Sequence, residues 1–232
     1  MKVGIMQPYF LPYIGYWQLL NAVDKYVIYD DVNFIKKGWI NRNRILMNGQ
    51  ATLFNIQMKG ASQNKKINEI EISKENVWRN KLLKSIELSY KKAPFYEVIF
   101  PIIKTIINFE TKNLAKYIEN SIRVICEYLD INTKLIISSD LKKDNILKGE
   151  DKIINICKIL GANEYYNAIG GRELYNYDTF KKNDIKLKFL KTENFMYKQF
   201  GDSYIEGLSI LDVIMFNSKE EVKAMLNKYS LI

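Results

Sequence analysis

The chain alternates between short β-branched runs and amphipathic stretches, which is the pattern of a mixed α/β protein. It predicts a first strand at Lys2–Met6, a helix over Tyr13–Val23 from apolar positions at helical spacing, and a second strand at Tyr26–Tyr29. A strand, a helix and a strand in succession form a βαβ unit. We therefore expect a parallel sheet with a right-handed crossover.

The same pattern continues to the C-terminus. It predicts a hairpin that turns at Asn48–Gly49 and strands at Ala51–Met58, Ile67–Ile72, Lys134–Ile137, Glu164–Asn167 and Ile185–Leu190. Helices are predicted at Val77–Tyr90, in two pieces over Phe95–Leu129, at Asp151–Leu160 with Gly161 as C-cap, at Ser209–Phe216 and at Ser218–Lys228. The expected fold is α/β, with a Rossmann-like, mainly parallel sheet at the N-terminal side and C-terminal helices. We expect one domain over residues 1–232, with a helical subdomain at about 77–130.

Polar residues follow most of the predicted strands. These residues are Gln7, Asp30, Asp31, Ser138, Ser139 and Asn167, the last of which stands just before Gly170 and Gly171. Ligands of open parallel sheets bind outside the carboxyl ends of the strands. We therefore expect these separated residues to line one crevice.

Composition narrows the choice of function. Apolar residues make up 47% and charged residues 26% of the chain, as in globular proteins, and no apolar run is long enough to span a bilayer. No signal-peptide pattern opens the chain, so a cytoplasmic location is expected. Cys126 and Cys157 lie on apolar faces of predicted helices and are expected to be buried, inert thiols.

The chain has no histidine, which excludes histidine-based catalytic triads and the usual zinc sites. A general base must then be a carboxylate, a lysine, a tyrosine or the substrate itself, and we assign no metal site. The formal charge is +9, from 35 basic and 26 acidic residues. Because the lysines are spread along the chain without a dense basic stripe, no nucleic-acid partner is expected.

The segment Gln7–Tyr16 is the first candidate binding element. Pro8 and Pro12 restrict the backbone, and Gly15 allows a ligand or another chain segment to approach closely. A helix that begins here would offer free N–H groups to an anion. Gln7, Pro8 and Tyr9 are the predicted contacts, and the alternative is a rigid turn that holds aromatic core residues.

The second candidate is Asp30–Arg44, where charged side chains are mixed with aromatic ones. Arginine forks suit phosphate, tryptophan offers a stacking face, and an aspartate can accept a proton. We take Asp30, Asp31 and Lys36 as candidate catalytic residues, and Trp39, Asn41, Arg42 and Arg44 as candidate substrate-binding residues. The alternative is a solvated loop.

Two weaker candidates lie nearer the C-terminus. Asn167 with Gly170 and Gly171 would cradle a phosphate or form a tight turn, although the P-loop lysine is missing. Asp212 stands in an apolar run and needs a partner if it is buried. It either anchors the C-terminal helix or reaches Arg42 or Arg44.

The sequence blocks together resemble the WbqC-like family of bacterial gene clusters for O-antigen and other surface polysaccharides. The blocks are MQPYFLPYIGYW, YDDVNFIKKGWINRNRI, SYKKAPFY, the Ser138–Ser139 pair, NAIGGRELY and LSILDVIMFN. Many relatives carry a histidine before the Gln-Pro pair, where this chain has Met6. The first block also resembles a degenerate nucleotidyltransferase opening that lacks both of its histidines.

The resemblance implies a transferase that acts on a nucleotide-linked amino sugar, by acyl or aminoacyl transfer. In this hypothesis Lys36, Arg42 and Arg44 hold the diphosphate, Trp39 or Tyr9 stacks on the base or sugar, and Asp30 or Asp31 takes a proton from the amine. The cofactor is left open between acyl-coenzyme A and an acyl-carrier protein, and the basic charge would suit an acidic carrier protein. The alternatives are a non-catalytic nucleotide-sugar binding component and a nucleotidyltransferase-like enzyme.

Overall fold

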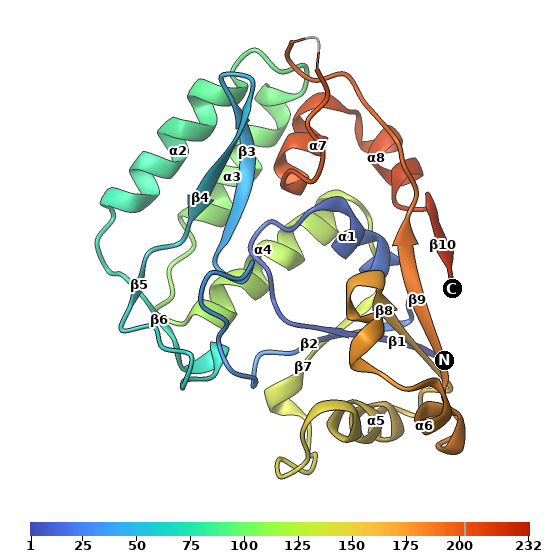
Figure 1. The fold of residues 1–232 in the computed structure, drawn as a ribbon. Helices are drawn as coiled ribbons and strands as arrows, with labels where there is room; N and C mark the ends of the chain where they lie inside the picture. The colour runs from blue at the N-terminus through green and yellow to red at the C-terminus, as the bar shows by residue number, and fades with distance from the viewer. Residues whose placement is uncertain (202) are drawn as a thin grey trace.

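The protein is built on a six-stranded sheet, seen in a computed structural model that describes residues 1–201 and 203–232 (Figure 1). The strand order is β10-β9-β8-β1-β2-β7. The parallel strands are β1 (Lys2–Met6), β2 (Lys25–Ile28), β7 (Lys134–Ile137), β8 (Glu164–Ala168) and β9 (Lys186–Thr192). At one edge β10 (Tyr229–Leu231) pairs antiparallel with β9. The predicted α/β fold with a mostly parallel sheet is confirmed.

Helices cover both faces of this sheet (Figure 1). The first hydrophobic cluster contains the buried residues of α1 (Ile14–Asn21) and α4 (Leu114–Tyr128). The second contains those of α5 (Gly149–Leu160) and α6 (Tyr177–Lys182). On β1, Val3 and Ile5 belong to the second cluster, as the two-residue alternation of a strand requires.

The chain changes direction across the sheet between β1 and β8. From β1 it runs outward through β2 to β7, and then α5 carries it back to β8 on the other side of β1. This reversal is the topological switch point at which Rossmann-like folds open a crevice. Gln7 follows β1 at this point, and Ile169 follows β8.

A long insertion separates β2 from β7. It holds the hairpin β3 (Arg42–Met47) and β4 (Gln50–Asn55), the pair β5 (Met58–Lys59) and β6 (Glu71–Ile72), and the helices α2 (Val77–Tyr90), α3 (Tyr96–Ile107) and α4. The predicted hairpin turn is confirmed: Asn48 and Gly49 have φ of 50° and 72°, the left-handed values that a two-residue turn favours. Buried residues of α2 and α3 join the same cluster as α1.

The C-terminal part folds back over the α1 face. After β9, the segment 193–208 leads to α7 (Ile210–Phe216), α8 (Lys219–Met225) and β10. Ser209 caps α7, and Ser218 with Glu221 forms the predicted capping box of α8. Gly161, with φ of 69°, ends α5 as predicted.

Some short elements differ from the prediction. The strand predicted at Ile67–Ile72 is wrong for its first half, which is a 3-10 turn at Ile67–Glu69 whose Asn68 N–H donates to the Asp30 carbonyl. The strand predicted at Ala51–Met58 is broken, because Ile56 N–H turns to the Asn41 carbonyl instead of extending the hairpin. The sequence pattern missed α6 and β10, which have six and three residues.

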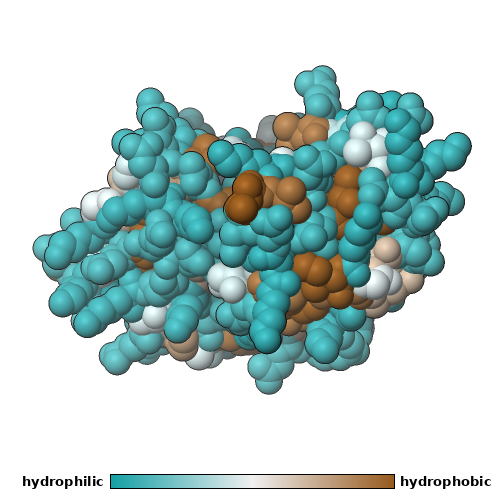
Figure 2. Space-filling model, turned by 90° about the horizontal axis from the view of Figure 1, so that it is seen from below, coloured by the Kyte–Doolittle hydropathy of each residue, from teal (hydrophilic) through white to brown (hydrophobic). Residues whose placement is uncertain are grey.

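The surface on the α5 side is mainly polar. Figure 2 views the molecule from this side and shows hydrophilic residues interrupted by several hydrophobic areas. The apolar side chains of α5 and α6 lie beneath, in the second cluster. Among the described residues, no helix is long and apolar enough to cross a bilayer.

Candidate functional site

A rigid turn places two tyrosines at the start of α1. Phe10 and Leu11 are fully buried, and the Leu11 carbonyl accepts hydrogen bonds from Asn43 Nδ2 (2.9 Å) and Ser209 Oγ (2.7 Å). These bonds fix the backbone, so Tyr9 and Tyr13 on either side reach a cavity. Burial raises the pKa of both phenols, which therefore remain neutral hydrogen-bond donors at physiological pH.

Gly15 is required by close packing behind this turn. A Cβ atom at Gly15 would lie 2.4 Å from a ring carbon of Tyr13 and 2.7 Å from Thr192 Oγ1. The conformational freedom of glycine is not the reason, because its φ is ordinary for an L-residue. Any larger side chain would push the Tyr13 ring out of place.

The first half of the site is an aromatic and basic cavity of about 250 Å³. Its lining comes from the α1 turn, the start of β3 and the 193–208 segment: Tyr9, Pro12, Tyr13, Trp39, Asn43, Arg44 and Gly207. Trp39 is 42% exposed, and the guanidinium carbons of Arg42 and Arg44 each lie 5.5 Å from the centroid of its ring. This cavity offers an aromatic ring with two positive charges near it, one of them, Arg44, in the cavity lining.

The two arginines are held differently. Arg42 donates from Nε to the Gly38 carbonyl (2.9 Å) and from Nη2 to the Lys37 carbonyl. Arg44 donates from Nη2 to the Gly207 carbonyl (3.0 Å), and its buried Nε has no partner among the described residues. Arg44 also lines the cavity with its guanidinium group.

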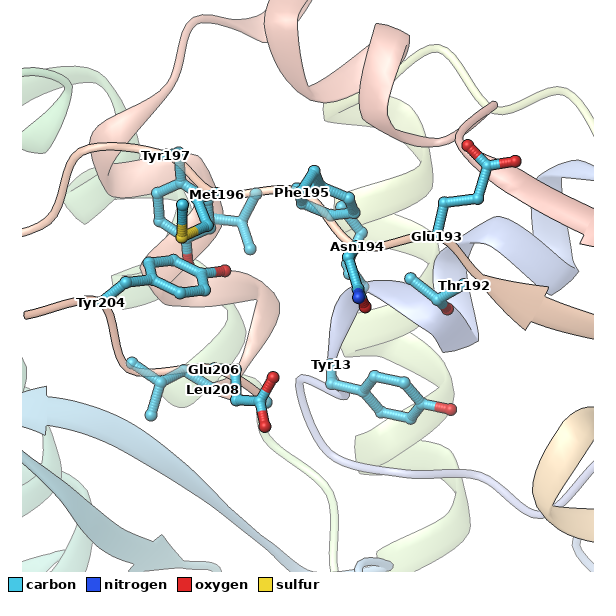
Figure 3. Close-up of a pocket in the computed structure, with 13 residues that line it drawn as sticks. Tyr13, Thr192, Glu193, Asn194, Phe195, Met196, Tyr197, Tyr204, Glu206 and Leu208 are labelled. Carbon is cyan, nitrogen blue, oxygen red and sulfur yellow. The ribbon is translucent and has the colours of Figure 1, made fainter.

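The second half is an adjoining cavity of about 420 Å³ that shares Tyr13 and Gly207 with the first. It lies between the start of α1 and the 193–208 segment. Figure 3 shows the Tyr13 and Tyr204 rings, the Asn194 amide and the Glu206 carboxylate around its opening, with the Glu193 carboxylate directed away. The two cavities adjoin at Tyr13 and Gly207, and together we call them the α1 cleft; Arg44 lines the first cavity, and Glu206, which precedes the Gly207 that Arg44 bonds, lines the second.

Asp212 anchors the wall of the α1 cleft. It is 0% exposed and accepts hydrogen bonds from Tyr90 Oη (2.8 Å), Tyr197 Oη (2.6 Å) and Gln199 Nε2 (2.7 Å). Burial raises the pKa of Asp212, and these donors only partly oppose that shift. Its partners are thus neutral donors and not Arg42 or Arg44. Since Tyr197 lines the cleft, Asp212 joins the 193–208 segment to α2 and α7.

Asp30 lies at the carboxyl end of β2, away from the α1 cleft, and is held by three hydrogen bonds. Its carboxylate accepts from Ser139 N (2.9 Å), Ser139 Oγ (2.6 Å) and Asn68 Nδ2 (3.2 Å). The contact joins the ends of β2 and β7, two of the strand ends that the sequence predicts to converge. Asp30 and Ser139 line a separate cavity of about 250 Å³ at the start of α4.

Asp31 faces the opposite side of the sheet and pairs with two lysines. Lys143 Nζ lies 2.9 Å and Lys152 Nζ 3.2 Å from the same atom, Asp31 Oδ2. Burial works to raise the pKa of Asp31, but the neighbouring Ser138 hydroxyl and the lysine ammoniums outweigh it and hold the pKa below its ordinary value. Asp31 is therefore a poor proton acceptor.

The other predicted residues are dispersed. Asn167 donates to Tyr165 Oη (3.0 Å) and accepts from Ala168 N–H (2.7 Å), so it braces the end of β8. Gly170 and Gly171 lie in a 3-10 turn at Ile169–Leu174. Of the remaining predicted residues, Lys36 is exposed, whereas Pro8 and Asn41 are buried. The backbone carbonyl of Gln7 accepts a hydrogen bond from Tyr16 Oη.

Several residues of the site were not found from the sequence. They are Tyr13, Asn194, Tyr204 and Glu206 in the α1 cleft and Lys143 and Lys152 beside Asp31. The segment 193–208 has no strand or helix period, and its only signal was the density of aromatic and acidic residues. Cys126 and Cys157 are buried, and burial raises the pKa of each thiol to about 12, as inert thiols require.

The sheet order and the cleft define the class: a Rossmann-like α/β protein with a polar, aromatic cleft beside its first helix. The chain belongs to the WbqC-like protein family, whose sequence model matches residues 7–224. It is 29% identical over 221 residues to a Mycobacterium tuberculosis protein named "Uncharacterized protein Rv1507c", with 93% of each chain covered. No solved structure matches the chain.

Proposed function

We propose that the protein is a transferase that places an acyl or aminoacyl group on the amine of a nucleotide-linked amino sugar, in surface-polysaccharide biosynthesis. The observation that carries this proposal is the polarity of the α1 cleft. One of its two cavities offers Trp39 with two arginines near its ring, and the adjoining cavity offers the Glu206 carboxylate. A nucleotide-linked amino sugar has groups of the matching kinds: an aromatic base, a diphosphate and an amine.

Each end has a defined role in this proposal. Trp39 stacks on the base, and the Arg44 guanidinium, which lines the cavity, binds a phosphate oxygen. Arg42 adds positive charge behind the Trp39 ring but is already bonded to two carbonyls. Tyr9 and Tyr13 donate hydrogen bonds to phosphate or sugar oxygens in the middle of the cleft.

Glu206 is the proposed proton acceptor in place of Asp30 or Asp31. Asp30 is held by three hydrogen bonds and Asp31 by two ammonium groups, whereas Glu206 is exposed at the cleft. The Glu206 carboxylate binds the ammonium form of the sugar and takes one proton from it. The free amine attacks the acyl carbon of a thioester donor on coenzyme A or a carrier protein. The C–N bond forms, the C–S bond breaks, and the thiol leaves.

The test is a thermal-shift screen of nucleoside-diphosphate amino sugars, followed by an amide-formation assay with acyl thioesters. Ligand at a hundred times its Kd stabilises the folded state by about 2.7 kcal/mol, which is a shift of roughly 5 °C or more for a chain of this size. Arg44→Gln and Trp39→Ala should each weaken binding about 10- to 100-fold, since a hydrogen bond to a charged group contributes about 1.5–3 kcal/mol and stacking of a base on an aromatic ring about 1–3 kcal/mol. Arg123→Gln, an exposed arginine outside the cleft, is the matched control and should bind normally.

The assay separates the proposal from its alternatives. Glu206→Gln should lower the rate of amide formation about 10²- to 10⁴-fold, the range typical of general-base loss. Binding without turnover by any acyl donor would favour a non-catalytic nucleotide-sugar component. A thermal shift that needs a nucleoside triphosphate and Mg²⁺ would favour nucleotidyl transfer. Equal binding by wild type and Arg44→Gln would refute the site.

A further inference from the structure

The second cavity of the α1 cleft has an apolar inner surface. Ile14, Leu208 and Val213 line this cavity, and they are only 8%, 3% and 3% exposed, so they form its deepest part. They come from three separate places in the chain: the start of α1, the segment before α7, and α7 itself. The roles proposed above for the cleft residues leave these three side chains unused.

Aromatic rings continue this apolar surface towards the opening. Phe195 and Tyr197 line the cavity and pack against the first hydrophobic cluster. The Tyr204 ring meets the Tyr197 ring edge to face, with the two centroids 5.2 Å apart (Figure 3). Because Tyr197 Oη donates to the buried Asp212 carboxylate at 2.6 Å, this wall of the cavity is held in place.

The Glu206 carboxylate supplies the charge at the opening of the cavity. Of the described residues that line the cavity, Glu193 and Glu206 are acidic and none is basic. Figure 3 shows the Glu193 carboxylate directed away from the opening. In the proposed function Glu206 takes the proton of the sugar amine. The acyl carbon that this amine attacks therefore lies in the same cavity, next to the apolar surface.

We infer that this apolar surface binds the hydrocarbon chain of the acyl donor, so that the transferred group is a short, neutral acyl chain and not an aminoacyl group. This inference rests on the proposed function. The amine forms the C–N bond with the thioester carbon as the C–S bond breaks. Glu206 takes one amine proton before the attack, and the leaving thiolate takes the second. The chain on that carbon extends to Val213 and Leu208, where the buried side chains limit its length.

An aminoacyl group fits this surface poorly. A glycyl group carries an ammonium two bonds from the carbonyl carbon, at the place where an acyl chain meets the apolar side chains. Burying an unpaired ammonium is costly, and Glu206 is engaged by the sugar amine. A propionyl group has nearly the same shape, with a methyl in place of the ammonium. Burial of each further methylene strengthens binding about fourfold.

The test compares amide formation from acetyl, propionyl, butyryl and glycyl thioesters of N-acetylcysteamine, the end of the arm that coenzyme A and carrier proteins share. kcat/KM should rise about fourfold per methylene from acetyl to butyryl, and propionyl should exceed glycyl at least tenfold. Val213→Leu extends into the cavity and should lower the butyryl-to-acetyl ratio at least fourfold. Val222→Ala, at a fully buried valine of α8 outside the cleft, should keep the wild-type ratio. Partial unfolding cancels in such a ratio, so a loss of stability alone leaves it unchanged.

Binding of the same thioesters without the sugar separates this inference from the proposed function. Titration calorimetry should give the same order of affinity, with butyryl tightest and glycyl weakest. Binding in this order without amide formation would leave the apolar site standing and refute the transferase. Amide formation at equal rates from glycyl and propionyl thioesters would leave the transferase standing and overturn the inference. A preference for glycyl, an unchanged ratio in Val213→Leu, or the absence of binding by every thioester would also overturn it.

Discussion

Replacing Asp212 with alanine should lower the unfolding free energy of the protein more than a substitution at the surface does, because Asp212 anchors the wall of the α1 cleft. The carboxylate is 0% exposed and accepts from Tyr90, Tyr197 and Gln199 at 2.6–2.8 Å. Asp212→Ala leaves three donors without an acceptor, and an unsatisfied buried donor costs about 1–3 kcal/mol. The expected loss of unfolding free energy is therefore about 3–5 kcal/mol, comparable to breaking a buried charged network. For a chain of this size, that lowers the melting temperature by roughly 6–20 °C.

The assay is denaturant unfolding followed by tryptophan fluorescence, with nucleotide-sugar binding as a second readout. Binding should weaken in Asp212→Ala even below its melting temperature, because Tyr197 and Gln199 hold the 193–208 segment. Asp130→Asn, which removes exposed ion pairs with Lys219 and Lys223 and tolerates the left-handed φ of 55° at this position, is the control and should lose little stability. A loss below about 1 kcal/mol in Asp212→Ala would refute this account of the network.

The pH dependence of Asp212 has a defined sign. Because the folded state raises its pKa, the folded protein binds the proton of Asp212 more tightly than the unfolded chain does. The contribution of Asp212 to stability is therefore full below its unfolded pKa and is lost as pH rises through the folded pKa. The difference in unfolding free energy between wild type and Asp212→Asn should therefore decrease as the pH rises from the unfolded pKa of Asp212 through its folded pKa. A difference that grows with rising pH would contradict the assignment.

Two further predictions concern the thiols and the turn before α1. Cys126 and Cys157, whose pKa values are raised to about 12, should resist a thiol reagent at pH 8 until the protein is unfolded; rapid labelling of the native protein would contradict their burial. Gly15→Ala should displace the Tyr13 ring and weaken ligand binding at least tenfold, whereas Gly170→Ala, which meets nothing within 4 Å, should bind as wild type. Titration calorimetry should measure the affinity of both variants for the nucleotide sugar. Equal affinities of Gly15→Ala and Gly170→Ala would show that the position of Tyr13 does not matter for ligand binding.

The sheet was predictable because its strands carry a strong local signal. Lys134–Ile137 is a short β-branched run bounded by polar residues, and the structure has a strand with the same bounds. The positions of Asp30 and Ser139 at neighbouring strand ends follow from the parallel order and place their side chains in contact at 2.6 Å. The β10 strand was missed because its three residues are stabilised by pairing with β9 and not by their own pattern.

The composition of the α1 cleft was predictable only in part, because its two ends come from distant segments. Tyr9, Trp39 and Arg44 belong to motifs near the N-terminus, where aromatic and charged residues are visibly mixed. Glu206 lies in an irregular segment that reaches the cleft because Asp212 and Arg44 hold it there. Such long-range contacts have no local sequence signal. The same reason explains why Lys143 and Lys152 could not be assigned to Asp31 from the sequence.

The most direct test of the proposed function compares two ligands that differ at one group. Isothermal titration calorimetry should measure binding of a nucleoside-diphosphate amino sugar and of its N-acetylated form to wild type and to Glu206→Gln. The account predicts that wild type binds the free-amine sugar at least about fivefold more tightly, a difference of about 1 kcal/mol, and that Glu206→Gln abolishes this preference. Equal affinity of wild type for the two sugars, or a preference that persists in Glu206→Gln, would contradict the assignment of the amine to the acidic end of the cleft.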